Sequence, residues 1–130
     1  KMMSTFYGLL FTRYPAAKAL FGRNSQNDQE KMLGDALMML VESLDEPAVI
    51  EEKMIAVGRK HVDYEVEDHM YAWVKDCLME TFRRASASDW SAELEENWST
   101  VLDAVATIGI RGAAIERAER ASAQPSAPPQ

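Results

Sequence analysis

The sequence predicts an all-α protein, and two observations carry that prediction. Apolar residues recur at spacings of three and four through most of the 130 residues, which is the period of helices with one buried face. No segment shows the two-residue alternation, bounded by turn residues, that indicates a half-buried strand. With 47% apolar content, the chain is long enough for one helical core and too short for two.

The first half of the chain contains three predicted helical segments. The first is the apolar stretch 6–11, which ends near Pro15, and Pro15 can begin a short second helix through Leu20. A polar loop at 22–26 precedes a third helix, for which Asn27 and Glu30 match a capping box. The apolar face of this third helix comprises Leu33, Ala36, Leu37, Leu40, Val41 and Leu44.

The second half contains three further helices. Pro47 after Glu46 begins a helix whose apolar face is formed by Ile50, Met54, Val57 and His61. After a turn at 62–68, the next helix ends at the cluster SASDWS, and its apolar face is Met70, Val74, Cys77, Leu78, Thr81 and Phe82. Ser91 can cap the last helix, whose apolar face is Leu94, Trp98, Val101, Leu102, Val105 and Ile108. The Pro-rich residues 122–130 are expected to form a disordered tail or linker after a domain spanning 1–121.

Composition and charge exclude several functional classes. Fourteen Lys and Arg against 21 Asp and Glu give a net charge of −7, which opposes binding to nucleic acid or to an anionic membrane. The longest apolar run, 36–41, is far below the ~20 residues that span a bilayer, and no signal-peptide pattern opens the chain. We therefore expect a soluble, cytoplasmic protein. The only cysteine, Cys77, lies on an apolar helical face, where a buried and unreactive thiol is expected.

His61 ends an otherwise apolar helical face, and the residues leave two interpretations open. The first is a core histidine with its ring hydrogen-bonded to a backbone carbonyl. The second is an axial ligand of haem iron, whose other ring nitrogen donates to a carbonyl one turn back, that of Val57. Zinc and non-haem sites are poorly supported, because one Cys and two His show none of the usual ligand spacings. The other histidine, His69, is expected to be solvated at the polar start of the next helix.

Five segments, in order along the chain, resemble the bacterial globins, specifically the single-domain haemoglobins of the Vitreoscilla type and the haem domain of flavohaemoglobins. These segments are FYGLLFTRYPAAKALF at 6–21, DQEKML at 28–33, GRKHVDYEV at 58–66, HMYAWVKDCLMETF at 69–82 and the ENWSTVLDAVATI region of the last helix. The resemblance implies a globin fold that holds haem b and binds O2, NO and CO at its five-coordinate ferrous iron. It also implies that this chain begins inside the family's second helix and lacks the usual first one.

On one side of the haem, the resemblance makes His61 the proximal iron ligand. Val57 would supply the carbonyl that orients the His61 ring, Val66 would pack on the haem edge, and Tyr71 corresponds to a tyrosine near the proximal histidine. Tyr7 and Tyr71 could instead be core tyrosines whose hydroxyls reach the surface. The haem interpretation therefore rests on the whole set of matching residues.

On the opposite, distal side, the resemblance makes Tyr7 and Gln29 the donors to a bound gas. Leu33 corresponds to the apolar residue over the iron, and Phe21 to the phenylalanine that packs on the porphyrin face. A hydrogen bond from Tyr7 or Gln29 to bound oxygen should contribute ~1.5–3 kcal/mol, as bonds to charged groups do. Because ~1.4 kcal/mol is a factor of ten, oxygen should leave about one to two decades more slowly than from an apolar pocket.

Two departures from the flavohaemoglobin pattern affect the expected activity. A glutamate late in the family's last helix aligns with Ala113, and its replacement favours reversible oxygen binding over peroxidase-type chemistry. No flavin or nicotinamide domain follows, so we do not expect an enzyme unless a separate reductase supports nitric oxide detoxification. A gas or redox sensor acting on a partner and a haem-free interaction module remain alternatives. The chain is expected to be a monomer or a homodimer.

Overall fold

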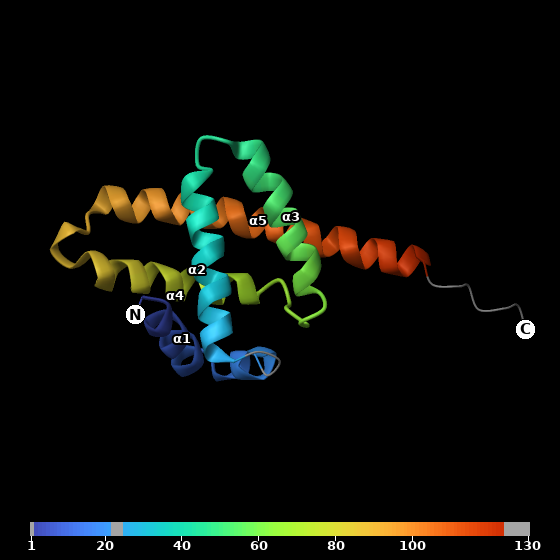
Figure 1. The fold of residues 1–130 in the computed structure, drawn as a ribbon, viewed down its shortest axis with the longest axis horizontal. Helices are drawn as coiled ribbons and strands as arrows, with labels where there is room; N and C mark the ends of the chain where they lie inside the picture. Colours follow the sequence, from blue (N-terminus) through green and yellow to red (C-terminus); the bar gives the residue numbers. More distant parts are fainter. Residues whose placement is uncertain (1, 22–24, 124–130) are drawn as a thin grey trace, which may run out of the picture.

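The computed structural model describes residues 2–21 and 25–123 (Figure 1). They form five α-helices and two 3-10 helices: α1 (Met2–Arg13), η1 (Pro15–Phe21), α2 (Gln26–Glu42), α3 (Pro47–His61), α4 (Met70–Ser86), η2 (Ala87–Asp89) and α5 (Ala92–Ala123). No strand occurs within these two ranges, and the all-α prediction is confirmed. None of the described helices is both long and apolar enough to cross a membrane.

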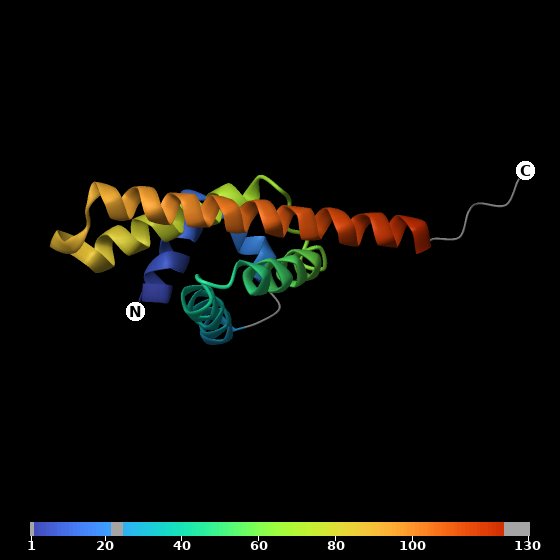
Figure 2. The same cartoon turned by 90° about the horizontal axis from the view of Figure 1, so that it is seen from above.

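The helices α4 and α5 lie side by side and antiparallel, and they form one layer of the molecule (Figure 2). α1, α2 and α3 lie on one face of this layer (Figure 2). Within the second layer, α1 packs on α4, α3 packs on α5, and α2 packs chiefly on α1. The two long helices therefore form a platform, and α2 is the helix that is least attached to it.

The core lies where α1 crosses α4. Its buried side chains are Phe6, Tyr7, Leu10, Ala17, Cys77, Leu78, Met79, Phe82 and Leu102. Cys77 is completely buried, and burial raises the pKa of its thiol to about 11, so the cysteine is an unreactive core residue, as expected from the sequence. The neighbouring Thr81 hydroxyl donates to the Cys77 carbonyl at 2.7 Å, which satisfies a buried polar group inside the helix.

Glycines allow α3 and α5 to touch through their backbones. A Cβ atom on Gly58 would lie 2.0 Å from the Gly109 carbonyl oxygen, and one on Gly112 would lie 2.4 Å from that of Ile55. No side chain fits at either crossing point. Glycine inside a helix costs ~1 kcal/mol relative to alanine, and here the cost is offset by the close packing of two helices. This crossing fixes the position of α3, the helix that ends at His61.

Three details of the predicted elements differ from the structure. Ser25, not Asn27, is the N-cap of α2, and its side chain accepts the Asp28 N–H at 3.1 Å. α2 ends at Glu42, and Val41 and Leu44 from its predicted apolar face are 48% and 49% exposed. α5 continues through residues 122 and 123, which the sequence placed in the tail; residues 22–24 of the predicted loop and 124–130 of the tail lie outside the described residues.

Candidate functional site

His61 is the last residue of α3, and its ring is half-buried. Its Nδ1 atom lies 3.2 Å from the Tyr71 hydroxyl oxygen, and the centroids of the two rings are 5.9 Å apart. The Val57 carbonyl was the partner predicted for this nitrogen, whereas in the structure its partner is the Tyr71 hydroxyl. In the tautomer whose Nδ1–H donates to the Tyr71 oxygen, Nε2 carries the free lone pair that a metal requires.

Burial determines the protonation state of this pair. It lowers the pKa of His61 below its ordinary value of 6.5, because the protonated imidazole loses its hydration. It also raises the pKa of Tyr71 to about 12, with a smaller contribution from the charge of Asp68. Both side chains are therefore neutral at pH 7. A neutral imidazole is the form that binds iron.

The residue that places the Tyr71 ring is Gly109, which is not among the site residues predicted from the sequence. A Cβ atom on Gly109 would lie 2.8 Å from Tyr71 Cε1, so the ring occupies the space that a side chain at 109 would need. Gly109 is thus part of the site although it carries no functional group. A signal for it was present, because a glycine in the interior of a long predicted helix costs stability and indicates a close approach.

The residues that the resemblance assigns to the distal side come together at the start of α2. Tyr7 is buried in α1, and its hydroxyl donates to the backbone carbonyl of Gln29 at 3.2 Å. The Tyr7 and Phe21 rings meet edge to face with centroids 5.5 Å apart. Leu33 lies one turn after Gln29 and packs, partly buried, against the same core. Burial raises the pKa of Tyr7 to about 12, so its hydroxyl is a neutral donor at pH 7.

A flat apolar group at this site would lie between α2 and α3. The two helices diverge from the short connection at 43–46, and few of their residues are in contact (Figure 1). Leu33 and Leu37 of α2, Val57 of α3 and Val66 of the loop after α3 are only half-buried, as is His61. An apolar macrocycle such as haem would cover these surfaces, so the residues present fit the group that the resemblance implies.

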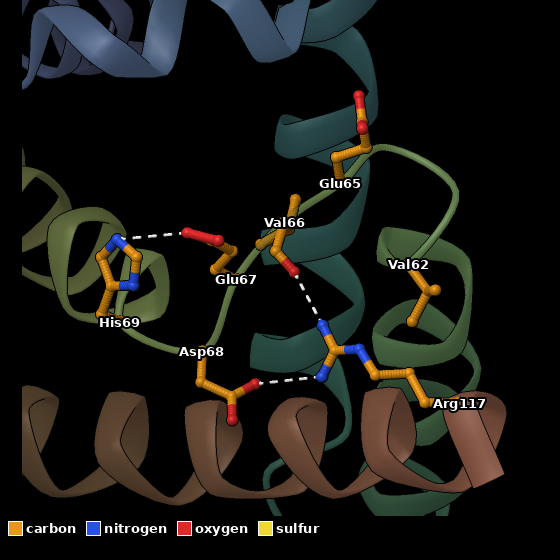
Figure 3. A pocket seen from close by; sticks show the side chains of 7 residues that line it. All are labelled: Val62, Glu65, Val66, Glu67, Asp68, His69 and Arg117. Atoms are coloured by element: carbon orange, nitrogen blue, oxygen red, sulfur yellow. Dashed lines mark hydrogen bonds and ion pairs between the residues drawn. The ribbon is translucent and has the colours of Figure 1, made fainter.

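Next to these surfaces, the loop after His61 forms an open cavity of about 720 Å³ against α5 (Figure 3). It is lined by Val62, Glu65, Val66, Glu67, Asp68, His69 and Arg117. His69 is exposed, as the sequence predicted, and its ring meets Trp73 edge to face. Within residues 2–21 and 25–123, no cluster of three or more His, Cys, Asp or Glu side chains could hold a metal ion.

Ala113, the residue aligned with the flavohaemoglobin glutamate, is buried in α5 and 1% exposed. The next carboxylate along the helix, Glu116, accepts hydrogen bonds from Arg59 at 3.1 Å and from Arg120 at 2.7 Å. Both bonds lower the pKa of Glu116, and the bond from Arg120 makes the largest contribution. Glu116 is therefore an ionised partner of two arginines.

Comparisons with known proteins agree with this geometry. The sequence model of the Globin family matches residues 4–108, and the chain belongs to the globin family. An uncharacterized globin-like protein of Aquifex aeolicus (strain VF5) is 30% identical over 80 residues, which cover 62% of this chain and 57% of that protein. This chain therefore spans less than two thirds of that relative. Leghemoglobin 49 of Vicia faba is 28% identical over 112 residues, which cover 78% of this chain and 77% of the leghemoglobin.

Two solved structures share the fold. One is an engineered carbene transferase derived from a proposed nitric oxide dioxygenase of Rhodothermus marinus, with a TM-score of 0.83 at 25% identity, covering 92% of this chain and 83% of that one. The other is a bacterial globin from Campylobacter jejuni, with a TM-score of 0.74 at 20% identity, covering 92% of this chain and 84% of that one. The predicted globin fold and the resemblance to bacterial globins are confirmed.

Proposed function

We propose that this globin holds haem b through His61 and binds O2, NO and CO reversibly. The observation that carries the proposal is the state of His61: a half-buried, neutral imidazole whose Nδ1 atom is engaged by Tyr71. Membership of the globin family supports it. Haem iron, when bound, supplies a coordination position at which a diatomic gas can bind and leave.

The proximal residues hold the imidazole. Tyr71 fixes the rotation of the His61 ring through Nδ1, and an acceptor at that position raises the basicity of the other nitrogen. A neutral tyrosine oxygen is a weaker acceptor than a carboxylate. Because Ala113 supplies no carboxylate, the imidazole should keep little anionic character, which favours reversible binding over peroxide chemistry. Val57 and Val66 would exclude water from the haem edge.

The distal residues act on the gas. The Tyr7 hydroxyl is a neutral donor that can stabilise partial negative charge on a bound molecule, and Gln29 supplies a second donor through its side-chain amide. Phe21, packed on Tyr7, and Leu33 would keep this side of the site apolar. An apolar surrounding strengthens each hydrogen bond and keeps water from competing with the gas.

We further propose that the same pocket can support nitric oxide detoxification, in which oxygen reacts with nitric oxide. The similarity to the engineered derivative of a proposed nitric oxide dioxygenase supports it. Haem iron, when bound, would supply the position for oxygen, and repeated turnover would need an electron from a reductase. Consumption of nitric oxide over many turnovers only when a ferredoxin or flavin reductase is added would establish this use. A single turnover per haem would restrict the protein to gas binding.

Absorption spectra of the purified protein with added haemin test the proposal. We expect an intense Soret band that moves on reduction with dithionite and again with carbon monoxide. His61→Ala should lose the ferrous and carbon monoxide spectra of the wild type, whereas His69→Ala, which changes the exposed histidine, should keep them. A protein that takes up no haemin would refute gas binding and favour a haem-free interaction module.

A further inference from the structure

The turn after His61 has the hydrogen-bond pattern of a Schellman motif. The Val66 N–H donates to the His61 carbonyl at 3.2 Å, five residues back. The Glu65 N–H donates to the Val62 carbonyl at 3.1 Å. The Tyr64 N–H also reaches the His61 carbonyl, at 3.1 Å. The His61 carbonyl therefore accepts two hydrogen bonds from this turn, and a change in the path of residues 62–66 would break them.

Glu65 occupies the position of this motif that glycine usually fills. Its φ of 62° lies in the left-handed region, which costs a residue with a Cβ atom about 1 kcal/mol. A strained residue of this kind persists only where surrounding contacts hold it in place. The contacts of the residue that follows, Val66, are therefore important for the whole turn.

Arg117 of α5 provides that contact. Its Nη2 atom donates to the Val66 carbonyl at 3.1 Å, and its Nη1 atom lies 3.5 Å from Asp68 Oδ1 (Figure 3). The side chains of Arg117 and Asp68 are 45% and 58% exposed, so their ion pair contributes little. The bond to the Val66 carbonyl is the more specific contact, because it fixes a backbone group of the residue that closes the turn on His61.

Neighbouring residues of α5 hold the chain on both sides of His61. Glu116 accepts a hydrogen bond from Arg59, two residues before the histidine, and Arg120 donates to Asp63, two residues after it. Both contacts join side chains, which can adjust without moving the backbone. Arg117 differs from them, because it binds the main chain of the turn itself.

We propose that Arg117 is a positioning residue for His61. Its guanidinium holds the Val66 carbonyl, the held turn keeps two N–H donors on the His61 carbonyl, and the end of α3 thereby presents the imidazole to Tyr71 in one orientation. The consequence for iron rests on the proposed function, since it requires haem on His61. The effect on the turn and on the imidazole is present in the haem-free protein.

Arg117→Met tests the proposal, because methionine keeps most of the aliphatic stem and loses every donor. Arg111→Met is the matched control: Arg111 is also on α5 and pairs with Glu51 on α3 at 3.2 Å, with a similar side-chain exposure of 50%. Amide exchange measured by NMR in the haem-free proteins reports on the turn. The imidazole nitrogen signals of His61 report on its orientation toward Tyr71.

In Arg117→Met we expect the Tyr64 and Val66 amides to exchange about fivefold faster and the His61 nitrogen signals to move, both relative to Arg111→Met. Arg117→Lys, which can still donate to the carbonyl, should recover part of each change, and Asp68→Asn should leave both near wild type. Equal behaviour of Arg117→Met and Arg111→Met would overturn the proposal. So would an Asp68→Asn variant that reproduces Arg117→Met, because the ion pair would then hold the turn.

Haem loading separates this proposal from the proposed function. With haem bound, the iron–histidine stretching band of the reduced protein should move in Arg117→Met and not in Arg111→Met. A wild-type protein that takes up no haemin would refute the proposed function, while the haem-free measurements would still decide whether Arg117 positions His61.

Discussion

Tyr7→Phe removes one hydroxyl from the proposed distal site and keeps the buried ring. In the structure this hydroxyl donates to the Gln29 backbone carbonyl at 3.2 Å. A phenol has a single O–H, so Tyr7 has to leave that carbonyl before it can donate to a bound gas. The structure thus adds a competing acceptor that the sequence did not reveal.

The competition sets the size of the expected effect. A hydrogen bond to a ligand with partial negative charge contributes ~1.5–3 kcal/mol, and the bond to the carbonyl that is given up contributes ~0.5–1.5 kcal/mol. Subtracting like ends of the two ranges leaves a net stabilisation of bound oxygen of about 1–1.5 kcal/mol. Because ~1.4 kcal/mol is a factor of ten, Tyr7→Phe should release oxygen about five to twelve times faster than the wild type. This range is smaller than the one to two decades expected without the carbonyl.

Stopped-flow displacement of oxygen by carbon monoxide measures this rate in the reduced, haem-loaded protein. Tyr14→Phe is the matched control, since the Tyr14 hydroxyl donates to Asp76 at 2.8 Å and has no part in the distal site. Tyr7→Phe should also lower the unfolding free energy of the haem-free protein by about 0.5–1.5 kcal/mol. A variant that is less stable but releases oxygen at the wild-type rate would refute the reasoning, because the hydroxyl would then serve only the fold.

Three other substitutions and a change of pH have expected outcomes. Gly109→Ala brings a Cβ atom to 2.8 Å from Tyr71 Cε1, so it should lower the unfolding free energy by about 1–3 kcal/mol and move the His61 NMR signals. Gly8→Ala, with no atom within 4 Å of the added Cβ, should leave the unfolding free energy unchanged or raise it; urea titration measures both variants. Glu65→Gly relieves the φ of 62° and should raise the unfolding free energy by about 1 kcal/mol; a loss would show that the turn is not strained. Burial lowers the pKa of His61 below 6.5, so the unfolded chain binds the proton more tightly. Haem-free stability should therefore fall as the pH drops below about 6.5 in the wild type and in His69→Gln, and it should fall less in His61→Phe, which lacks this contribution.

Most of the fold could be predicted because its signals are local. Pro47 begins α3 as expected, and the Ser91 hydroxyl accepts the Leu94 N–H at 3.1 Å at the start of α5. The predicted N-cap of α2 was wrong. Ser25 and Asn27 are both good N-cap residues, and the types of their side chains do not decide between them. The exposure of Val41 shows a second limit: periodicity identifies an apolar face but not whether another element covers it.

The site was less predictable because its contacts join distant parts of the chain. The resemblance singled out Tyr7, Phe21 and Gln29, and the structure brings them together. The Tyr71 partner of His61 depends on the path of the intervening turn, so helical geometry favoured the Val57 carbonyl instead. The contact between Arg117 and the Val66 carbonyl joins positions 51 residues apart and has no local signal.

The most direct test of haem ligation by His61 is rescue of His61→Gly by imidazole. We expect the reduced wild-type protein with haemin to bind carbon monoxide and show an intense, shifted Soret band. His61→Gly should lose that spectrum and regain it on titration with free imidazole, and His69→Gly should behave as the wild type. A His61→Gly protein that keeps the wild-type spectrum without imidazole would contradict ligation by His61, and a wild-type protein that binds no haemin would contradict the haem site altogether.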